Sequence, residues 1–236
     1  MAGAWPLAPG ETQVIFKYER FESDRAWDRD GTLVDFPGRT DVWASAFVER
    51  GLTDRLTFQG RVGWTEGRDL FVDYQGRGPV EAGLRYAVRR DPRSPISVYL
   101  GVVSPGEGRN AGYAAPGAGD GDLEARLLWG RSATLWGRDV FVETQAGYLW
   151  RSGLPDEARL DGTLGVRAAP GWTLMAQTYS GRALGDGVGA EWLTGEVSVV
   201  RDLGSRFRLQ AGWRQSIGGR EAPRGGGPVL ALWARF

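Results

Sequence analysis

The chain has 236 residues, 29 basic and 29 acidic side chains, no net charge, no histidine and no cysteine. A chain without net charge offers no electrostatic attraction for nucleic acid, so we expect no nucleic-acid partner. The missing histidines exclude Ser-His-Asp hydrolysis and imidazole acid-base catalysis, and the missing cysteines exclude disulfides and thiolate metal sites. We therefore predict that the chain is not an enzyme and has no metal or cofactor.

Twelve segments in which polar and apolar residues alternate follow one another between Gln13 and the C-terminus. Each is about nine to twelve residues long, the length that a tilted strand needs to cross a membrane, and no run approaches the roughly 20 apolar residues of a membrane-spanning helix. In chain order they cover 12–21, 40–50, 55–66, 78–89, 95–104, 121–130, 138–150, 157–168, 171–182, 190–201, 205–217 and 228–236.

The alternation gives each segment one apolar and one polar face. In the third segment, Leu56 and Phe58 share a face and Thr57 and Gln59 lie opposite. This pattern is typical of a membrane barrel, but it also fits a soluble β-sandwich, in which the apolar face forms the core.

The links between the segments differ in length. The links "GLTDR", "RRDPRS", "AAPG" and "RDLGS" are short and carry turn residues, and "GRSATLWGRD" is somewhat longer. Most of the alternate links are long: "ESDRAWDRDGTLVDFPGR", "EGRDLFVDYQGR", "SPGEGRNAGYAAPGAGDG", "RALGDGVG" and "GGREAPRGGG". Short turns at one end and long loops at the other are typical of bacterial outer-membrane barrels.

Aromatic residues on the apolar faces separate the two alternatives. At the long-loop end we expect Trp64, Tyr148, Trp150 and Trp213, and at the short-turn end Tyr86, Trp129 and Trp172. Two belts of Trp and Tyr around an aliphatic band indicate two membrane interfaces, whereas a soluble core has no reason to separate its aromatic residues in this way. We predict one all-β domain over 1–236, a transmembrane antiparallel up-and-down β-barrel of 12 strands.

The last residue, Phe236, resembles the terminal aromatic residue by which the barrel assembly machinery of Gram-negative bacteria recognises the last strand of its clients. The stretch "ERGLTDRLTFQGRVGW" is similar to the strand-turn-strand unit of outer-membrane transporters, including the XagA-like proteins associated with polysaccharide genes. These resemblances imply a bacterial outer-membrane location, with outer-membrane lipid, lipopolysaccharide and the assembly machinery as partners. No signal peptide is visible, and we interpret the chain as a processed form.

Charged residues of both signs alternate with the apolar positions and are expected to face the lumen. The predicted pore-lining residues are Arg61, Glu81, Arg85, Glu124, Arg126, Glu143, Arg206, Arg208, Arg214 and Arg235. Such charges can line a water-filled pore, or they can pair across strands and fill the lumen. We expect a passive channel for small hydrophilic solutes, including anionic or saccharide ones. The alternative is a non-conducting outer-membrane anchor or an accessory protein for polysaccharide export that works through its extracellular loops.

Overall fold

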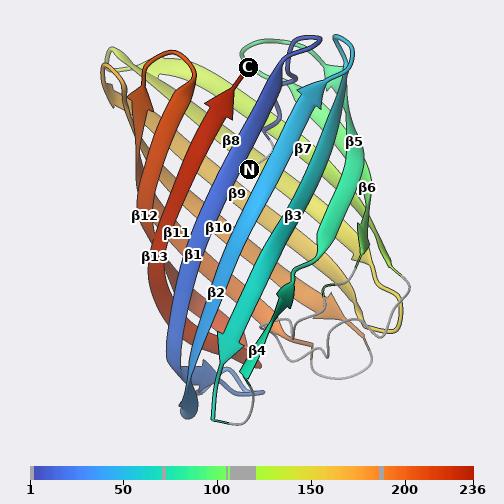
Figure 1. Cartoon of the computed structure of the whole chain (residues 1–236), viewed down its shortest axis with the longest axis vertical. Helices are drawn as coiled ribbons and strands as arrows, with labels where there is room; N and C mark the ends of the chain where they lie inside the picture. Colours follow the sequence, from blue (N-terminus) through green and yellow to red (C-terminus); the bar gives the residue numbers. More distant parts are fainter. Residues whose placement is uncertain (1–2, 71–72, 105, 107–120, 186–188) are drawn as a thin grey trace.

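The computed structural model describes the whole chain except residues 1–2, 71–72, 105, 107–120 and 186–188. Thirteen antiparallel strands make up the fold (Figure 1). They are β1 (Thr12–Trp27), β2 (Leu33–Gly51), β3 (Leu56–Arg68), β4 (Asp73–Arg77), β5 (Val80–Arg89), β6 (Ile96–Ser104), β7 (Asp122–Leu135), β8 (Arg138–Trp150), β9 (Asp156–Ala169), β10 (Trp172–Leu184), β11 (Glu191–Leu203), β12 (Phe207–Arg220) and β13 (Ala222–Arg235).

The strands close into a barrel, because β1 pairs with both β2 and β13. The other strands pair with their neighbours in chain order, except at β4 and β5. The short β4 and β5 pair with successive parts of β3, so together they form one of twelve staves. The predicted all-β, twelve-stranded antiparallel barrel is confirmed. Within the described residues, no helix is long and apolar enough to cross a membrane.

The predicted alternation sets the two faces of the wall. Leu84, Val142 and Leu209 point outward and are 45%, 37% and 46% exposed, whereas Thr57 and Gln59 point inward and are fully buried. An apolar outer face and a polar interior are the arrangement that a barrel needs in a lipid bilayer.

Two of the predicted long links are wrong, because their residues extend strands. The link over 22–39 is reduced to a turn in which the carboxylate of Asp28 accepts backbone hydrogen bonds from Asp30 and Thr32, at 2.9 and 2.8 Å. The link over 218–227 is reduced to a turn at Glu221, whose φ is 45°.

Other links also differ from the prediction. The link over 66–77 is largely strand, because β3 continues to Arg68 and β4 covers 73–77. The connection between β7 and β8 narrows to Trp136 and Gly137, with φ values of 50° and 71°, as in the tight turns that match the twist of a hairpin. Most of the link over 104–121 and part of the one over 182–189 lie outside the described residues.

Candidate functional site: the barrel lumen

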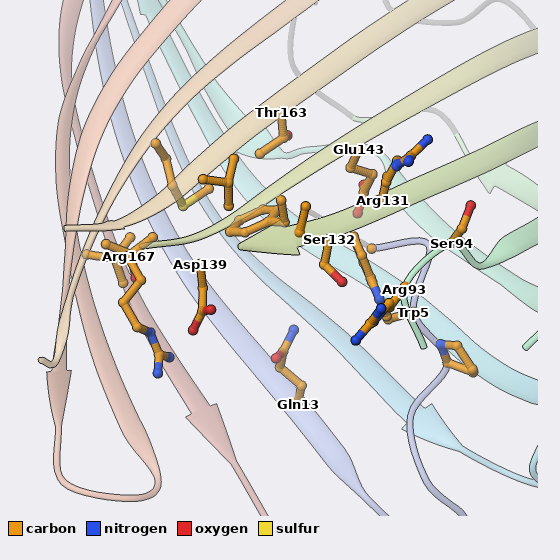
Figure 2. A pocket seen from close by; sticks show the side chains of 18 of the residues that line it. Trp5, Gln13, Arg93, Ser94, Arg131, Ser132, Asp139, Glu143, Thr163 and Arg167 are labelled. Carbon is orange, nitrogen blue, oxygen red and sulfur yellow. The ribbon is translucent and has the colours of Figure 1, made fainter. Parts of the chain in front are cut away.

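The lumen contains two cavities at opposite ends of the barrel. One, of about 1230 Å³, lies at the short-turn end and is lined by residues of the β5–β6 turn and of β8 to β13; we call it the vestibule (Figure 2). The other, of about 290 Å³, lies towards the long-loop end and includes Trp43, Arg61 and Arg151 in its lining. The two cavities have no lining residue in common, so the residues between them control any passage through the barrel.

An ion-pair cluster on β3, β5, β7 and β9 forms much of the wall of the smaller cavity. Glu81 accepts hydrogen bonds from both Arg61 and Arg126. Glu124 lies 3.2 Å from the guanidinium of Arg126 and 3.8 Å from that of Arg159. Because both carboxylates are almost fully buried, their charges are neutralised by these arginines rather than by water.

A second cluster lies on β1, β11 and β12. Glu196, whose side chain is fully buried, pairs with Lys17 at 3.3 Å and with Arg214 at 2.7 Å, and Glu19 lies within ion-pair distance of the same two cations. The ring of Tyr179 lies under the guanidinium of Arg214, 4.3 Å away. Two acids therefore neutralise two cations in one compact group on the inner wall.

The segment from Gly3 to Ala8, which we call the strap, lies against the inner wall of the barrel at the short-turn end. Arg85 donates to the carbonyls of Gly3 and Trp5, the latter at 3.1 Å. The Ser97 hydroxyl donates to the carbonyl of Ala4 at 2.9 Å, and the Ala4 amide donates to Glu143 at 3.0 Å. Hydrogen bonds from three staves thus hold the strap against the inner wall.

The side chains of the strap complete this contact. The Trp5 indole donates to the Pro92 carbonyl at 2.9 Å and packs edge-on against Phe141, with ring centroids 6.2 Å apart. A Cβ on Gly130 would lie 2.7 Å from the Trp5 ring, so this glycine leaves the space that the indole fills. The strap narrows the lumen where the vestibule ends.

The strap is also anchored at its exit from the barrel. Glu11 forms an ion pair with Arg235 at the end of β13 and accepts a hydrogen bond of 3.2 Å from the Ala8 amide. The hydrogen bond from Arg235 holds the pKa of Glu11 below its usual value of 4.5.

Apolar side chains cover part of the vestibule wall. The Phe141 ring lies over Gly165, where a Cβ would clash with it, and Met175 is the residue paired with Gly165 on the next strand. Val200 and Trp233 continue this lining on β11 and β13, and the Trp233 indole is fixed by a 3.0 Å hydrogen bond to Gln210. The vestibule is therefore not uniformly polar.

The structure places the predicted pore-lining residues in different surroundings. Arg85 and Glu143 point inward but are covered by the strap, and Glu81 and Glu124 are buried in the first cluster. The more exposed inward arginines are Arg61, Arg208 and Arg235, with side chains 45–50% exposed, and Arg126 and Arg214 are largely covered.

The continuous arginine stripe expected on the last two strands is broken up. Arg206 lies exposed in the β11–β12 turn rather than on a strand, because β12 begins at Phe207. Arg208 pairs with Asp202 at 3.1 Å, Arg214 with Glu19 and Glu196, and Arg235 with Glu11. These acidic partners partly cancel the positive electrostatic potential of the arginines.

The predicted interface aromatic residues point outward at the expected ends. Trp64, Trp150 and Trp213 are 48%, 47% and 52% exposed, and Tyr148 packs against Trp150 with ring centroids 4.8 Å apart. At the short-turn end, Tyr86, Trp129 and Trp172 are 46%, 37% and 44% exposed. Phe236 exchanges two backbone hydrogen bonds of 2.9 Å with Thr12, which join the two ends of the barrel wall.

Sequence reasoning missed the strap and the aromatic residues inside the lumen. Tyr99 is 2% exposed and lies over Gly83 and Gly101, where a Cβ on either glycine would clash with its ring. Glycines placed opposite aromatic residues on neighbouring inward positions are the signal that could have revealed these rings. Within the described part of the chain, no group of three or more carboxylates could hold a metal ion.

The chain matches no family model and no curated protein, but solved structures share its fold. The COG4313 outer membrane channel from Pseudomonas putida F1 is similar with a TM-score of 0.71 and 16% identity, over 100% of this chain and 99% of that one. The translocator domain of the autotransporter NalP from Neisseria meningitidis is similar with a TM-score of 0.61 and 10% identity, over 98% of this chain and 90% of that one. A KdgM porin in complex with disordered oligogalacturonate is similar with a TM-score of 0.57 and 8% identity, over 94% of this chain and 99% of that one. The chain therefore has the fold of bacterial outer-membrane barrels.

Proposed function

We propose that the protein is an outer-membrane channel through which small hydrophilic solutes cross passively. The observation that carries this proposal is the large vestibule inside a closed barrel whose interior is lined with charged groups. The likeness to barrels described as a channel and as porins supports it. Charges of both signs along a narrow passage select solutes by size and by field.

The strap and the two ion-pair clusters set the size limit. The strap lines the larger cavity, and Arg61, Glu81, Glu124 and Arg159 of the first cluster line the smaller one. Solutes must therefore pass between side chains that are held by hydrogen bonds, which favours small ions and small polar molecules over oligomers. The oligogalacturonate in the KdgM porin is consistent with an anionic or saccharide solute here as well.

A second candidate is a non-conducting barrel that acts as an anchor or as an accessory to polysaccharide export through its extracellular loops. It is favoured by the absence of a shared lining residue between the two cavities and by the pairing of the buried lumen acids Glu81 and Glu196. In that case the clusters act as a permanent filling of the barrel.

The same proposal includes the surroundings of the barrel. The exposed apolar belt is suited to outer-membrane lipid and lipopolysaccharide. We propose Phe236 as the residue that the barrel assembly machinery recognises, since it directly follows β13 and is 62% exposed. Replacing Phe236 by serine should then slow assembly by the purified machinery without changing spontaneous folding into detergent.

Swelling of liposomes tests the channel. Liposomes that contain the folded protein should swell in isotonic glycine or arabinose faster than empty liposomes, and more slowly in larger saccharides. Equal swelling of protein-containing and empty liposomes in every solute, with insertion verified by heat-modifiable migration on a gel, would favour the second candidate.

A further inference from the structure

The vestibule wall combines two chemistries that a purely hydrophilic pore does not need. Part of it is formed by Phe141, Met175, Val200 and Trp233. Water gains nothing from contact with these side chains, whereas an apolar solute that covers them releases that water. A solute with an apolar body therefore fits this part of the cavity.

The mouth of the vestibule carries arginines. Arg167 on β9 and Arg93 in the β5–β6 turn are exposed and, among the described residues, neither guanidinium has an acidic partner within ion-pair distance. Arg208 and Arg235 add two further guanidinium groups, which pair with Asp202 and Glu11 respectively. Figure 2 shows Arg167 and Arg93 on different sides of the cavity.

Other acids at this mouth are already hydrogen-bonded. Asp91 accepts from Arg89 and from the backbone amide of Arg93, at 2.8 and 2.9 Å. Asp139, on the same side as Arg167 in Figure 2, accepts from the Thr134 hydroxyl at 3.3 Å. A guanidinium without an acidic partner is a planar donor fork suited to a carboxylate.

The arginines and the apolar side chains lie next to each other in the strand register. Arg208 is paired directly with Trp233 across β12 and β13. Arg167 is paired with Thr173, which is paired in turn with Val200. A ligand a few carbon atoms long can therefore touch an apolar residue and an arginine at once.

We propose that the vestibule is a binding site for small amphipathic carboxylates, with the apolar body on the Phe141–Met175–Val200–Trp233 wall and the carboxylate at Arg167 or at Arg208. This inference deepens the proposed channel function by naming the class of solute that is held at the short-turn end. Trp5 and Leu7 of the strap also line the site.

Equilibrium binding tests the site without requiring any current. The protein is placed in phosphatidylcholine nanodiscs and titrated calorimetrically with 4-phenylbutanoate, with empty nanodiscs as the blank. Butanoate keeps the charge without the ring, and 4-phenylbutanol keeps the ring without the charge. We expect saturable binding of 4-phenylbutanoate and at least about tenfold weaker binding of the other two compounds.

Variants assign the binding to named residues. The pair Arg167→Gln and Arg208→Gln should weaken 4-phenylbutanoate binding about tenfold, and Met175→Asp should weaken it as well. The matched control is Arg206→Gln, an exposed arginine at the same end that does not line the cavity, and it should bind like the wild type. Equal loss in the Arg206 variant, or no loss in the paired variant, would overturn the site.

The outcome separates the two proposals. Saturable binding in a protein that passes no solute rejects the channel and retains the site. Solute passage without saturable binding of 4-phenylbutanoate retains the channel and rejects the site.

Discussion

Trp5 provides the sharpest test of the strap, because its indole packs against the inner wall of the barrel. The indole is half-buried between Phe141 and Gly130. A tryptophan buries about 150–250 Å² when fully covered, so Trp5→Ala removes roughly half of this, and at about 25 cal/mol per Å² the loss is about 2 kcal/mol. The free energy of docking the strap should become less favourable by that amount. The equilibrium constant between the docked and the released strap should therefore shift about thirtyfold towards release.

Single-channel recording measures this change as open probability. If the released strap leaves a wider passage, the Trp5→Ala barrel should spend about thirty times more time in its higher-conductance state, provided that this state starts as a minor one. Gly130→Ala should act in the same direction, because the added methyl group displaces the indole. Trp136→Ala is the matched control, since Trp136 is 96% exposed at the tip of a turn. Identical traces from all four proteins would refute a gating role for the strap.

Three further predictions concern stability and pH. Leu84→Arg and Leu209→Arg place a charge on the lipid face and should each cost about 2–4 kcal/mol in urea titrations of vesicle-folded protein, whereas Leu84→Phe should cost little; equal costs would contradict the assigned faces. Glu196→Gln should lower the unfolding free energy by about 2–3 kcal/mol, because Lys17 and the neighbouring arginine lose one of two buried acids, and an unchanged urea midpoint would show that the cluster contributes nothing. Glu11 has a lowered pKa in the folded protein, so its anchoring is fully present above pH 4.5 and is lost as the pH falls further; the higher-conductance state should become more frequent on acidification, and Glu11→Gln should remove this pH step.

The staves of the barrel could be predicted because lipid on one side and the lumen on the other impose a two-residue period. This period holds where the wall is in the membrane, as at Leu84 and Arg85 on β5. It fails in the last part of β1, which ends at Trp27, and in the first part of β2, which begins at Leu33, because many outward positions there are polar. Pro37 and Gly38 in the same stretch favour a loop, although the backbone pairs across a bulge near Ser23.

The contents of the lumen could be predicted only in part. The inward direction of the charged residues follows from the alternation, but their partners do not, since Lys17 and Glu196 are 179 positions apart in sequence. The strap has no periodic pattern at all, and only the structure shows that its carbonyls satisfy Arg85 and Ser97. Long-range pairs of this kind depend on the closure and tilt of the barrel rather than on any local sequence preference.

Ion conductance across a planar bilayer tests the central claim, a passage through the barrel, most directly. We predict small discrete current steps from the wild-type protein and larger steps from a variant that lacks residues 3–8, because the strap narrows the lumen at the end of the vestibule. Inserted protein that passes no current at any salt concentration or voltage, with and without the strap, would contradict the channel and leave the non-conducting barrel.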